Sequence, residues 1–374
     1  MLNKSKNDLI YNIAVSLIPK VGPAVYKNII SYSGSAENFF NLPTGKAGKI
    51  PKIGPKLLEA IKNKTTYLKQ AEKLIEEANK KNVKIFTYQD PGYPARLKNH
   101  EDSPVILFAK GNINLNPSRT IGIVGTRNAT TYGKTITRQI IEDIAPYKPT
   151  VISGLAYGID IEAHRAALQS ELPTIGILGS PVDIIYPAIH KQTSEAMMEA
   201  GGLVSEFKLG SDMVPGNFPQ RNRVIASLSD AVIVVEAAKK GGALITAEIA
   251  YSYNKEVFAV PGNLQSPFSE GCNSLIRRMK ANIYMGSRDL EEALSWSKDT
   301  ESPTPEKFEY QLDNFDESEI PILKAFLENK VQEIDELSWK TQTPISSLAS
   351  ILLQLEFQGI IKSLPGKKYQ LIIK

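Results

Sequence analysis

The sequence predicts an α/β fold with an extended Rossmann-like, doubly wound sheet, and three observations support it. Short apolar runs alternate with helical patterns between residues 120 and about 290. The runs are continuously apolar, as in parallel strands covered on both faces. Most of them end in a small or Gly-rich turn. The predicted strands are TIGIVG, TVISG, TIGILG, GLVSE, AVIVVE and EVFAVPG.

The first of these strands ends in a turn of the phosphate-binding type. Residues 121–135 are IGIVGTRNATTYGKT, an apolar run followed by a tight turn and a helical pattern. Backbone N–H groups at such a helix N-terminus favour a phosphate. A dinucleotide site would also place an acidic residue at the end of the second strand, to hold the ribose. That strand ends in Ser153-Gly154 instead, so the pattern predicts a phosphate site and disfavours a nicotinamide dehydrogenase.

The composition is that of an ordinary globular protein. The chain has 374 residues, of which 42% are hydrophobic and 22% charged. No run approaches the ~18 apolar residues of a membrane span, and the N-terminus lacks the apolar core of a signal peptide. Cys272 is the single cysteine, which excludes an internal disulfide and a thiolate zinc cluster. We therefore expect a cytoplasmic protein without a membrane partner.

The net charge of +4 is distributed unevenly. Residues 1–100 carry 17 Lys and Arg against 7 Asp and Glu, a net of +10. Residues 101–295 have a net of −2 and residues 296–374 a net of −4. A basic N-terminal segment fits a nucleic-acid surface, although charge alone is a weak indication.

Four segments follow from these patterns. We expect a helical domain over residues 1–80 and an extended Rossmann-like domain over residues 81–295. Within the latter, VKIFTY and PVILFAKG are predicted to extend the sheet at one edge. A polar, acidic, Pro-containing linker is predicted over 296–318 and a winged-helix-like domain over 319–374.

The helical domain contains a near-repeat, Pro19-Lys-Val-Gly-Pro23 and Pro51-Lys-Ile-Gly-Pro55, each between two helical patterns. This resembles the helix-hairpin-helix element of SAM-like domains, in which a Gly turn lets backbone N–H groups approach a nucleic-acid phosphate. A hairpin that only packs against its neighbours explains the pattern equally well, so DNA contact stays open here.

The last segment has three predicted helices followed by a short hairpin, the order of a winged helix. Many winged helices bind duplex DNA through a basic recognition helix. Residues 345–357 carry no Lys or Arg, and the segment is acidic overall. This favours a protein-contact or accessory role over that of a duplex-binding transcription regulator.

The turns at the strand ends are predicted to form one long groove at the carboxyl edge of the sheet. They are Gly125-Thr126-Arg127, Ser153-Gly154, Gly179-Ser180, Ser205-Glu206, residues 236–243 and Pro261-Gly262-Asn263. Arg127 follows the first turn, and Arg221 and Arg223 flank Asn222 just after Phe218. Arg binds phosphate through a planar fork, while Phe218 and Tyr186 are candidates for base stacking. For one of the two later arginines, a structural ion pair to Asp230 or Glu236 is an alternative.

Catalytic groups are scarce. None of the three histidines, His100, His164 and His190, has a metal-type spacing to another, and no ATP-binding Gly-x-x-x-x-Gly-Lys loop is present. His164 lies one helical turn after Asp160, a spacing typical of a hydrogen bond within the helix. We expect no metal, no cofactor and no catalytic residue.

An ordered series of motifs carries a more specific resemblance. The series is GTR (125–127), SGLAYGID..AH (153–164), LGSPVDIIYP (178–187), SE (205–206), FPQRNRVIASLSD (218–230), VVEA...GGALITA (234–247), VFAVPGN (257–263) and EGCNSLI (270–276). It resembles the DprA/Smf family of DNA-processing proteins, and the flanking helical and winged-helix segments fit that family's optional domains. Pro181 and Lys280 depart from the usual motifs, which affects local loop shape only.

The resemblance implies a single-stranded DNA-binding protein, not an enzyme, that forms a homodimer. It implies that the protein protects incoming single strands in natural transformation and loads the recombinase RecA onto them. It assigns DNA contacts to Gly125, Thr126, Arg127, Gly154, Lys191, Arg221, Asn222, Arg223, Gly242 and Ala243, and we add Phe218 to this set as the candidate stacking residue.

The main alternative is an enzyme similar to the nucleoside-monophosphate phosphoribohydrolases of the lysine-decarboxylase-like group. Those enzymes carry Pro-Gly-Gly-x-Gly-Thr-x-x-Glu. The comparable stretch here, residues 240–248, is KGGALITAE, in which Lys replaces the leading Pro and the second Gly-Thr step is missing. The register of Glu248 is also wrong for the motif.

Overall fold

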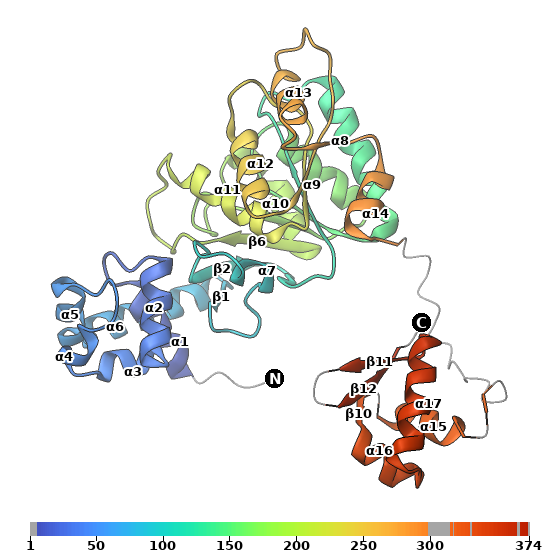
Figure 1. Ribbon diagram of the computed structural model, residues 1–374. Helices are drawn as coiled ribbons and strands as arrows, with labels where there is room; N and C mark the ends of the chain where they lie inside the picture. Colours follow the sequence, from blue (N-terminus) through green and yellow to red (C-terminus); the bar gives the residue numbers. More distant parts are fainter. Residues whose placement is uncertain (1–5, 298–314, 317, 330, 365–366, 373–374) are drawn as a thin grey trace. The chain divides into compact units, whose positions relative to one another are not determined.

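The computed structural model describes residues 6–297, 315–316, 318–329, 331–364 and 367–372 (Figure 1). The chain divides into two compact units, residues 1–299 and 300–374. The predicted helical and Rossmann-like domains share the first unit, so a boundary at residue 80 stays a prediction. Most of the predicted linker, 296–318, lies outside the described residues.

The first unit is built on a nine-stranded sheet with the order β1-β2-β6-β5-β4-β3-β7-β8-β9. The strands from β6 to β9 in this order are parallel to one another, whereas β1 and β2 pair antiparallel at one edge. The strands are β1 (Lys84–Thr87), β2 (Ile106–Lys110), β3 (Thr120–Val124), β4 (Thr150–Ser153), β5 (Thr174–Ile177), β6 (Gly201–Ser205), β7 (Ala231–Val234), β8 (Glu256–Ala259) and β9 (Asn282–Ile283).

The strand order reverses between β3 and β7, because β3 to β6 progress toward one edge and β7 to β9 toward the other. The parallel, doubly wound sheet and its antiparallel edge confirm the predicted fold class. In such sheets ligands bind outside the carboxyl ends of the strands at this switch point. The topology therefore places a ligand site after β3 and β7.

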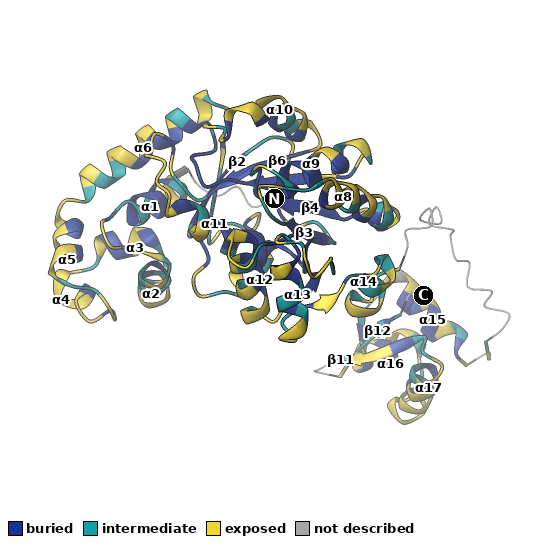
Figure 2. Ribbon diagram, turned by 90° about the horizontal axis from the view of Figure 1, so that it is seen from above, coloured by how far each residue is buried: buried dark blue, intermediate teal, exposed yellow. Residues whose placement is uncertain are grey.

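Helices cover both faces of the sheet, and the strands between them are buried (Figure 2). Ile121 and Ile123 of β3 pack with residues of α8 and α9 on one face, while Val232 and Val234 of β7 pack with residues of α11 and α12 on the other. The first face carries α8 (Thr131–Ile144), α9 (Ile159–Gln169), α10 (Lys191–Glu199) and α14 (Ser287–Leu294). The second carries α11 (Asn217–Leu228), α12 (Gly242–Ser252) and α13 (Glu270–Arg277).

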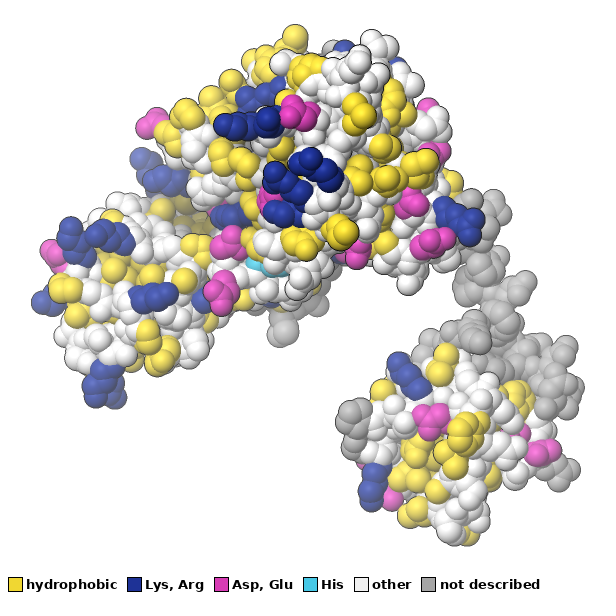
Figure 3. Space-filling view, turned by 45° about the horizontal axis from the view of Figure 1, so that its top comes forward, with side chains coloured by type: hydrophobic (Ala, Val, Ile, Leu, Met, Phe, Trp, Pro, Cys, Tyr) yellow, Lys and Arg dark blue, Asp and Glu magenta, His cyan; other side chains and the backbone are white. Residues whose placement is uncertain are grey.

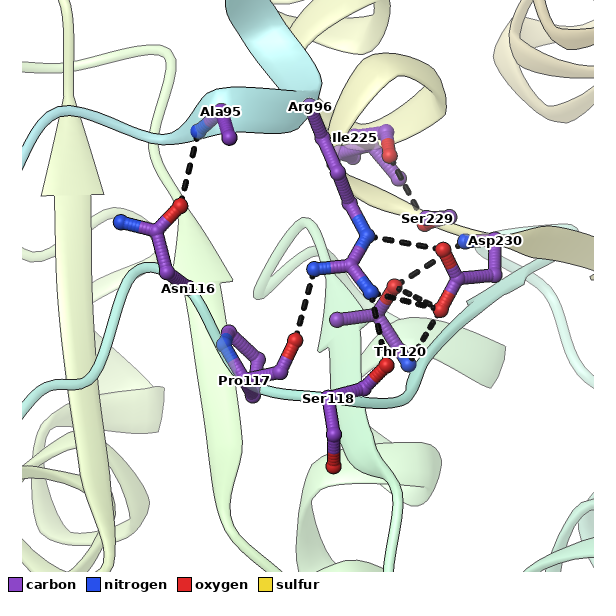
Figure 4. A network of polar contacts seen from close by, with 9 residues as sticks. All are labelled: Ala95, Arg96, Asn116, Pro117, Ser118, Thr120, Ile225, Ser229 and Asp230. Atoms are coloured by element: carbon purple, nitrogen blue, oxygen red, sulfur yellow. Dashed lines mark hydrogen bonds and ion pairs between the residues drawn. The ribbon is translucent and has the colours of Figure 1, made fainter. Parts of the chain in front are cut away.

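A short helix, α7 (Ala95–Lys98), lies between β1 and β2. Its Arg96 makes two hydrogen-bonded contacts with Asp230, at 2.7 and 2.9 Å, and a third bond to the carbonyl of Pro117 (Figure 4). Asp230 also accepts the N–H of Thr120 at 2.9 Å. This network ties α7 to the first residues of β3 and β7, so Asp230 pairs with Arg96 and not with Arg221 or Arg223 as considered above.

The N-terminal segment forms six helices that pack on the sheet through a shared core. Lys27 reaches the α7–β2 loop and donates to the carbonyl of His100 at 2.7 Å. The helices are α1 (Lys6–Ser16), α2 (Pro23–Ser33), α3 (Ala36–Asn41), α4 (Thr44–Ala47), α5 (Pro55–Lys62) and α6 (Lys64–Lys80).

The repeated pentapeptides take the same conformation. Gly22 and Gly54 precede the first residues of α2 and α5, each followed by a Pro in the first turn. Lys20 and Lys52 both adopt a positive φ, of 70° and 67°. The duplication seen in the sequence is therefore a structural duplication, and its contact with DNA stays a prediction.

The second unit has the predicted winged-helix order, with one additional strand. Its three-stranded sheet has the order β10-β12-β11. Leu337, Leu348, Leu352 and Leu355 fill the core between the helices. The elements are α15 (Ile320–Glu328), β10 (Val331–Glu333), α16 (Ile334–Thr341), α17 (Ile345–Phe357), β11 (Ile361–Leu364) and β12 (Lys368–Leu371).

Candidate nucleic-acid interface

A cleft of about 710 Å³ opens at the switch point between β3 and β7. We call it the main cleft. It is bounded by the turn after β3, the start of α9, helix α11, and the segment from β7 into α12. Its lining residues are Val124, Gly125, Thr126, Arg127, Ala156, Asp160, Tyr186, Pro215, Phe218, Pro219, Arg221, Asn222, Ile225, Ala237, Ala238, Lys240, Gly241, Gly242, Ala243, Ile245 and Thr246.

The loop that carries Arg127 is held in place by Glu236, the residue two positions after β7. The N–H of Thr126 donates to the Glu236 carbonyl at 2.7 Å. The Glu236 carboxylate accepts the Thr130 N–H at 2.9 Å and the Thr130 hydroxyl at 2.5 Å. Because Glu236 is buried and bonded to the loop, it positions Arg127 and does not pair with either arginine of α11.

Arg127 is exposed at the mouth of the main cleft, where its guanidinium lies 5.9 Å from the centre of the Phe218 ring. Phe218 in turn lies 5.5 Å from Tyr186, centre to centre. Among the described residues, Arg127 has no carboxylate partner. Lys240, which also lines the cleft, likewise has no carboxylate partner among the described residues. The cleft thus brings together two unpaired cations and two aromatic rings, the groups that a nucleic acid engages through phosphate and base.

Arg221 forms the floor of the main cleft and is only 4% exposed. It donates to the carbonyl of Gly154 at 2.6 Å and to that of Ile177. Burial lowers the pKa of its guanidinium to about 10, so it remains charged at neutral pH. A Cβ at Gly154 would collide with this guanidinium, so glycine is required there to admit Arg221.

Asp160 is the acidic residue of the cleft wall, and sequence reasoning did not assign it to the site. Burial raises the pKa of its carboxyl, and the charge of Arg221 opposes that rise. Backbone groups of Gly154 and Ala156 hydrogen-bond to it. Its place two residues after Gly158, in the first turn of α9, was a usable signal, because that start lies beside the turn after β3.

The first turn of α12 forms the opposite wall. The Asn222 amide donates to the carbonyl of Gly242 at 3.2 Å and so joins α11 to α12. A Cβ at Gly241 would meet nothing within 4 Å, and this residue caps the helix without a side-chain bond. The first turn of α12, whose backbone N–H groups have no partner within the helix, therefore lines the cleft beside Lys240.

Three predicted contact residues, Gly154, Arg223 and Lys191, lie outside the lining of the main cleft. Arg223 forms an ion pair with Glu206 at 2.5 Å and donates to the carbonyl of Asp102. The side chains of Arg223 and Glu206 are 13% and 10% exposed. The structural ion pair considered for this arginine therefore exists, with Glu206 as its partner. Lys191 is exposed at the first residue of α10.

Fewer of the predicted turns line the main cleft than the sequence suggested. The turns at 125–127 and 236–243 line it, whereas residues 153–154, 179–180, 205–206 and 261–263 do not, and Gly154 lies behind Arg221 instead. The expectation of six turns forming one groove was therefore wrong, because the strand order separates β5, β6 and β8 from the β3–β7 boundary. Basic side chains lie in separate groups on the unit's surface (Figure 3).

His164 does not pair with Asp160 as the helical spacing suggested. Its Nδ1 lies 2.7 Å from the hydroxyl oxygen of Thr174, which itself donates to the carbonyl of Val151 at 3.1 Å. His164 therefore donates from Nδ1, and its buried Nε2 has no hydrogen-bond partner among the residues that the structure describes. Burial lowers the pKa of the imidazole to about 3.

Within the described part of the chain, no group of three His, Cys, Asp or Glu side chains is arranged to hold a metal ion. None of the described helices has the length and apolar character needed to cross a membrane. Glu248, the residue nearest to a hydrolase-type glutamate, contacts Lys280 in an ion pair and does not line the main cleft.

These features define a Rossmann-like protein whose switch-point cleft offers cationic, backbone and aromatic groups together. Comparison with known proteins makes the assignment specific. Residues 84–295 match the family model of DNA recombination-mediator protein A, and residues 309–367 match the DprA winged helix domain. The chain belongs to the DprA/Smf family.

Individual relatives cover most of the chain. The chain is 32% identical to Protein Smf of Synechocystis sp. over 96% of its own length and 98% of the relative. It is 37% identical to Protein Smf of Escherichia coli over 73% of its length and 74% of the relative. It is 40% identical to DNA processing protein DprA of Bacillus subtilis over 54% of its length and 68% of the relative.

Two solved structures of DprA proteins share the fold. The X-ray structure of DprA from Streptococcus pneumoniae matches with a TM-score of 0.66 and 28% identity, over 79% of this chain and 99% of that one. A structure of Helicobacter pylori DprA, which concerns its single-stranded DNA binding mode, matches with a TM-score of 0.52 and 28% identity. That match covers 57% of this chain and 98% of the other.

Proposed function

We propose that this family member binds single-stranded DNA in the main cleft, protects incoming strands during natural transformation and loads RecA onto them. The observation that carries the proposal is the placement of Arg127, an unpaired guanidinium among the described residues, above the ring of Phe218 at the switch point. The binding described for the Helicobacter pylori relative supports the same ligand.

The physical case rests on two kinds of contact. Phosphate charge attracts Arg127, and the backbone N–H groups near Gly125, Thr126, Gly242 and Ala243 add uncharged donors. Base stacking on an aromatic ring contributes ~1–3 kcal/mol per base and tolerates any sequence. A duplex keeps its bases stacked inside, so it would gain only the phosphate contacts. The site thus favours single strands over duplexes.

The remaining predicted contacts take different parts in this proposal. Arg221 and Asn222 form the floor, where Arg221 adds charge from below, and the carbonyl of Gly154 holds Arg221 in place. Lys191 is exposed and would meet the strand beyond the main cleft, whereas Arg223 is paired with Glu206 and would support the fold around the cleft. We further propose that the protein acts as a homodimer in the cytoplasm, where RecA and the incoming strand meet, and that it performs binding without covalent chemistry.

The test is fluorescence anisotropy of labelled oligo-dT and of a duplex of equal length, with wild type and Arg127→Ala over a salt series. The control is Lys148→Ala, an exposed change at the amino ends of the strands. We expect tight, salt-sensitive single-strand binding that collapses in Arg127→Ala only. Equal affinity for both nucleic acids, or no effect of the substitution, would contradict the proposal.

Two further assays test the proposed loading of RecA and the proposed absence of covalent chemistry. RecA-dependent ATP hydrolysis on single-stranded DNA should start sooner when the wild-type protein is present, and Arg127→Ala should lose this effect. Incubation with nucleoside monophosphates should release no free base. Release of base that disappears in a Glu248→Gln variant would favour the phosphoribohydrolase alternative instead.

A further inference from the structure

A second cleft, of about 280 Å³, adjoins the main cleft and shares Arg127 with it. We call it the lateral cleft. It lies between the loop after β3, the first turn of α8, the first two turns of α9 and the residues just before α10. Besides Arg127, its lining includes Lys134, Tyr157, Arg165 and His190.

The two clefts are joined by direct contact between their loops. The N–H of Ile159 donates to the carbonyl of Thr126 at 3.2 Å. Gly158 has a φ of 78°, and a Cβ there would collide with the same Thr126 carbonyl. The loop that carries Tyr157 is therefore packed against the loop that carries Arg127, so a ligand at Arg127 has access to both clefts.

The lateral cleft has an uncompensated positive charge. Among the described residues, neither Lys134 nor Arg165 has a carboxylate partner, and Arg165 contacts only the Thr193 hydroxyl, at 3.4 Å. The one carboxylate that lines the cleft, Glu162, is paired with Arg138 at 2.5 Å. Three cations, counting Arg127, thus face this cleft while its acidic residue is neutralised.

An exposed aromatic ring accompanies these charges. Tyr157 is 48% exposed, and its ring packs edge-on against the His190 imidazole at 5.2 Å between centres. His190 is itself fixed by a bond of 2.8 Å between its Nδ1 and the carbonyl of Leu155. The Tyr157 ring is therefore held in place from one side and free on the other, as a stacking platform requires.

We propose that the lateral cleft is the second stretch of the DNA path: the single strand passes from the main cleft over Arg127 to Lys134 and Arg165, and stacks a base on Tyr157. This inference rests on the proposed function. An acidic peptide would also satisfy the cations, but it would leave the exposed ring of Tyr157 without a matching planar partner. The combination of cations with a platform favours a nucleic acid.

The experiment compares oligo-dT of increasing length, from about 4 to about 16 nucleotides, the range of common single-strand site sizes. Short oligonucleotides occupy the main cleft, whereas long ones reach the lateral cleft. The variants are Lys134→Gln/Arg165→Gln and Tyr157→Ala in the full-length chain. The matched control is Lys84→Gln/Lys148→Gln, which removes the same amount of positive charge. Both lysines are exposed and lie at the amino ends of strands, away from the carboxyl edge that carries the clefts.

In the lateral-cleft variants, the affinity for oligo-dT should rise less with oligonucleotide length than it does in wild type. For long oligonucleotides, Lys134→Gln/Arg165→Gln should reduce the slope of log affinity against log salt by about 1.4, since each phosphate contact on a single strand contributes about 0.7. Tyr157→Ala should weaken long-strand binding at least about fivefold relative to the short strand, and Tyr157→Phe should restore it.

Three outcomes would overturn the inference. The affinity of the lateral-cleft variants could rise with oligonucleotide length as steeply as that of wild type, or these variants could lose equal affinity for short and long strands. The control variant could also lose as much affinity as the lateral-cleft variants. Normal binding at every length with loss of RecA stimulation would make the cleft a protein surface and also overturn it. If wild type fails to bind even short strands, the proposed function itself fails, which is a distinguishable result.

Discussion

The loop after β3 and helix α11 both present arginine to the same cleft, yet they use it differently. Arg127 on the loop is exposed and has no carboxylate partner among the described residues. Arg221 on α11 is buried and bonded to two backbone carbonyls, and Arg223 is paired with Glu206. One region keeps its charge available to a ligand, whereas the other uses its charges to join β4, β5 and β6 to the helix.

The difference shows that burial determines what a positive charge in a motif can do. A guanidinium with free donors gains phosphate bonds at little cost in desolvation. A guanidinium that already satisfies buried carbonyls stabilises the fold, and its removal leaves those acceptors unpaired. The two regions should therefore separate in experiments that measure stability and binding independently.

The largest expected effect is that of Arg221→Ala on stability. The change removes the donor to Gly154 and Ile177 and the cation beside the buried carboxyl of Asp160. Breaking a buried charged contact of this kind costs about 3–5 kcal/mol. Urea denaturation followed by circular dichroism measures the loss, with Lys148→Ala as control. A loss below about 0.5 kcal/mol would contradict the structural role of Arg221.

Arg127→Ala should produce the opposite pattern. Loss of a charged hydrogen-bonding group should cost about 1.5–3 kcal/mol of single-strand binding free energy. The free energy of unfolding should change by no more than about 0.5 kcal/mol, because Arg127 is exposed. Anisotropy and denaturation on the same samples give both numbers. A destabilisation as large as that of Arg221→Ala would erase the contrast between the two regions.

Arg223→Ala should have a smaller effect, and mainly on stability. The Glu206 side chain is 10% exposed and would lose the cation that opposes the burial-raised pKa of its carboxyl. Leaving such a group unpaired costs about 1–3 kcal/mol. The salt dependence of binding should stay as in wild type, since the guanidinium is not in the main cleft. A reduced salt slope would return Arg223 to the set of direct DNA contacts.

Much of this arrangement could be predicted from the sequence. The rest depends on how deeply each side chain is buried in the fold. The apolar runs predicted the parallel strands, and the GTR turn predicted that Arg127 lies at the carboxyl edge of the sheet. Gly154 was predicted as a phosphate contact, but its lack of a side chain admits Arg221. The sequence shows that two arginines flank Asn222 and cannot show that both turn toward the protein interior.

The smallest effect concerns pH, and it tests whether α11 acts on the core beneath the cleft. Burial first, and then the nearby charge of Arg221, lowers the pKa of His164 to about 3 in the folded protein. The unfolded chain, with a pKa near 6.5, binds this proton more readily. Folding stability should therefore fall as the pH drops below about 6.5, by at most ~1.4 kcal/mol per pH unit.

Urea denaturation at several pH values from about 7 to about 5 measures this dependence. His164→Gln should flatten the curve over that interval, and His100→Gln, at a more exposed histidine, should flatten it less. An unchanged slope in His164→Gln would mean that the buried histidine accepts a proton in the folded state. In that case burial and the charge of Arg221 together would not keep the imidazole of His164 neutral in the folded protein.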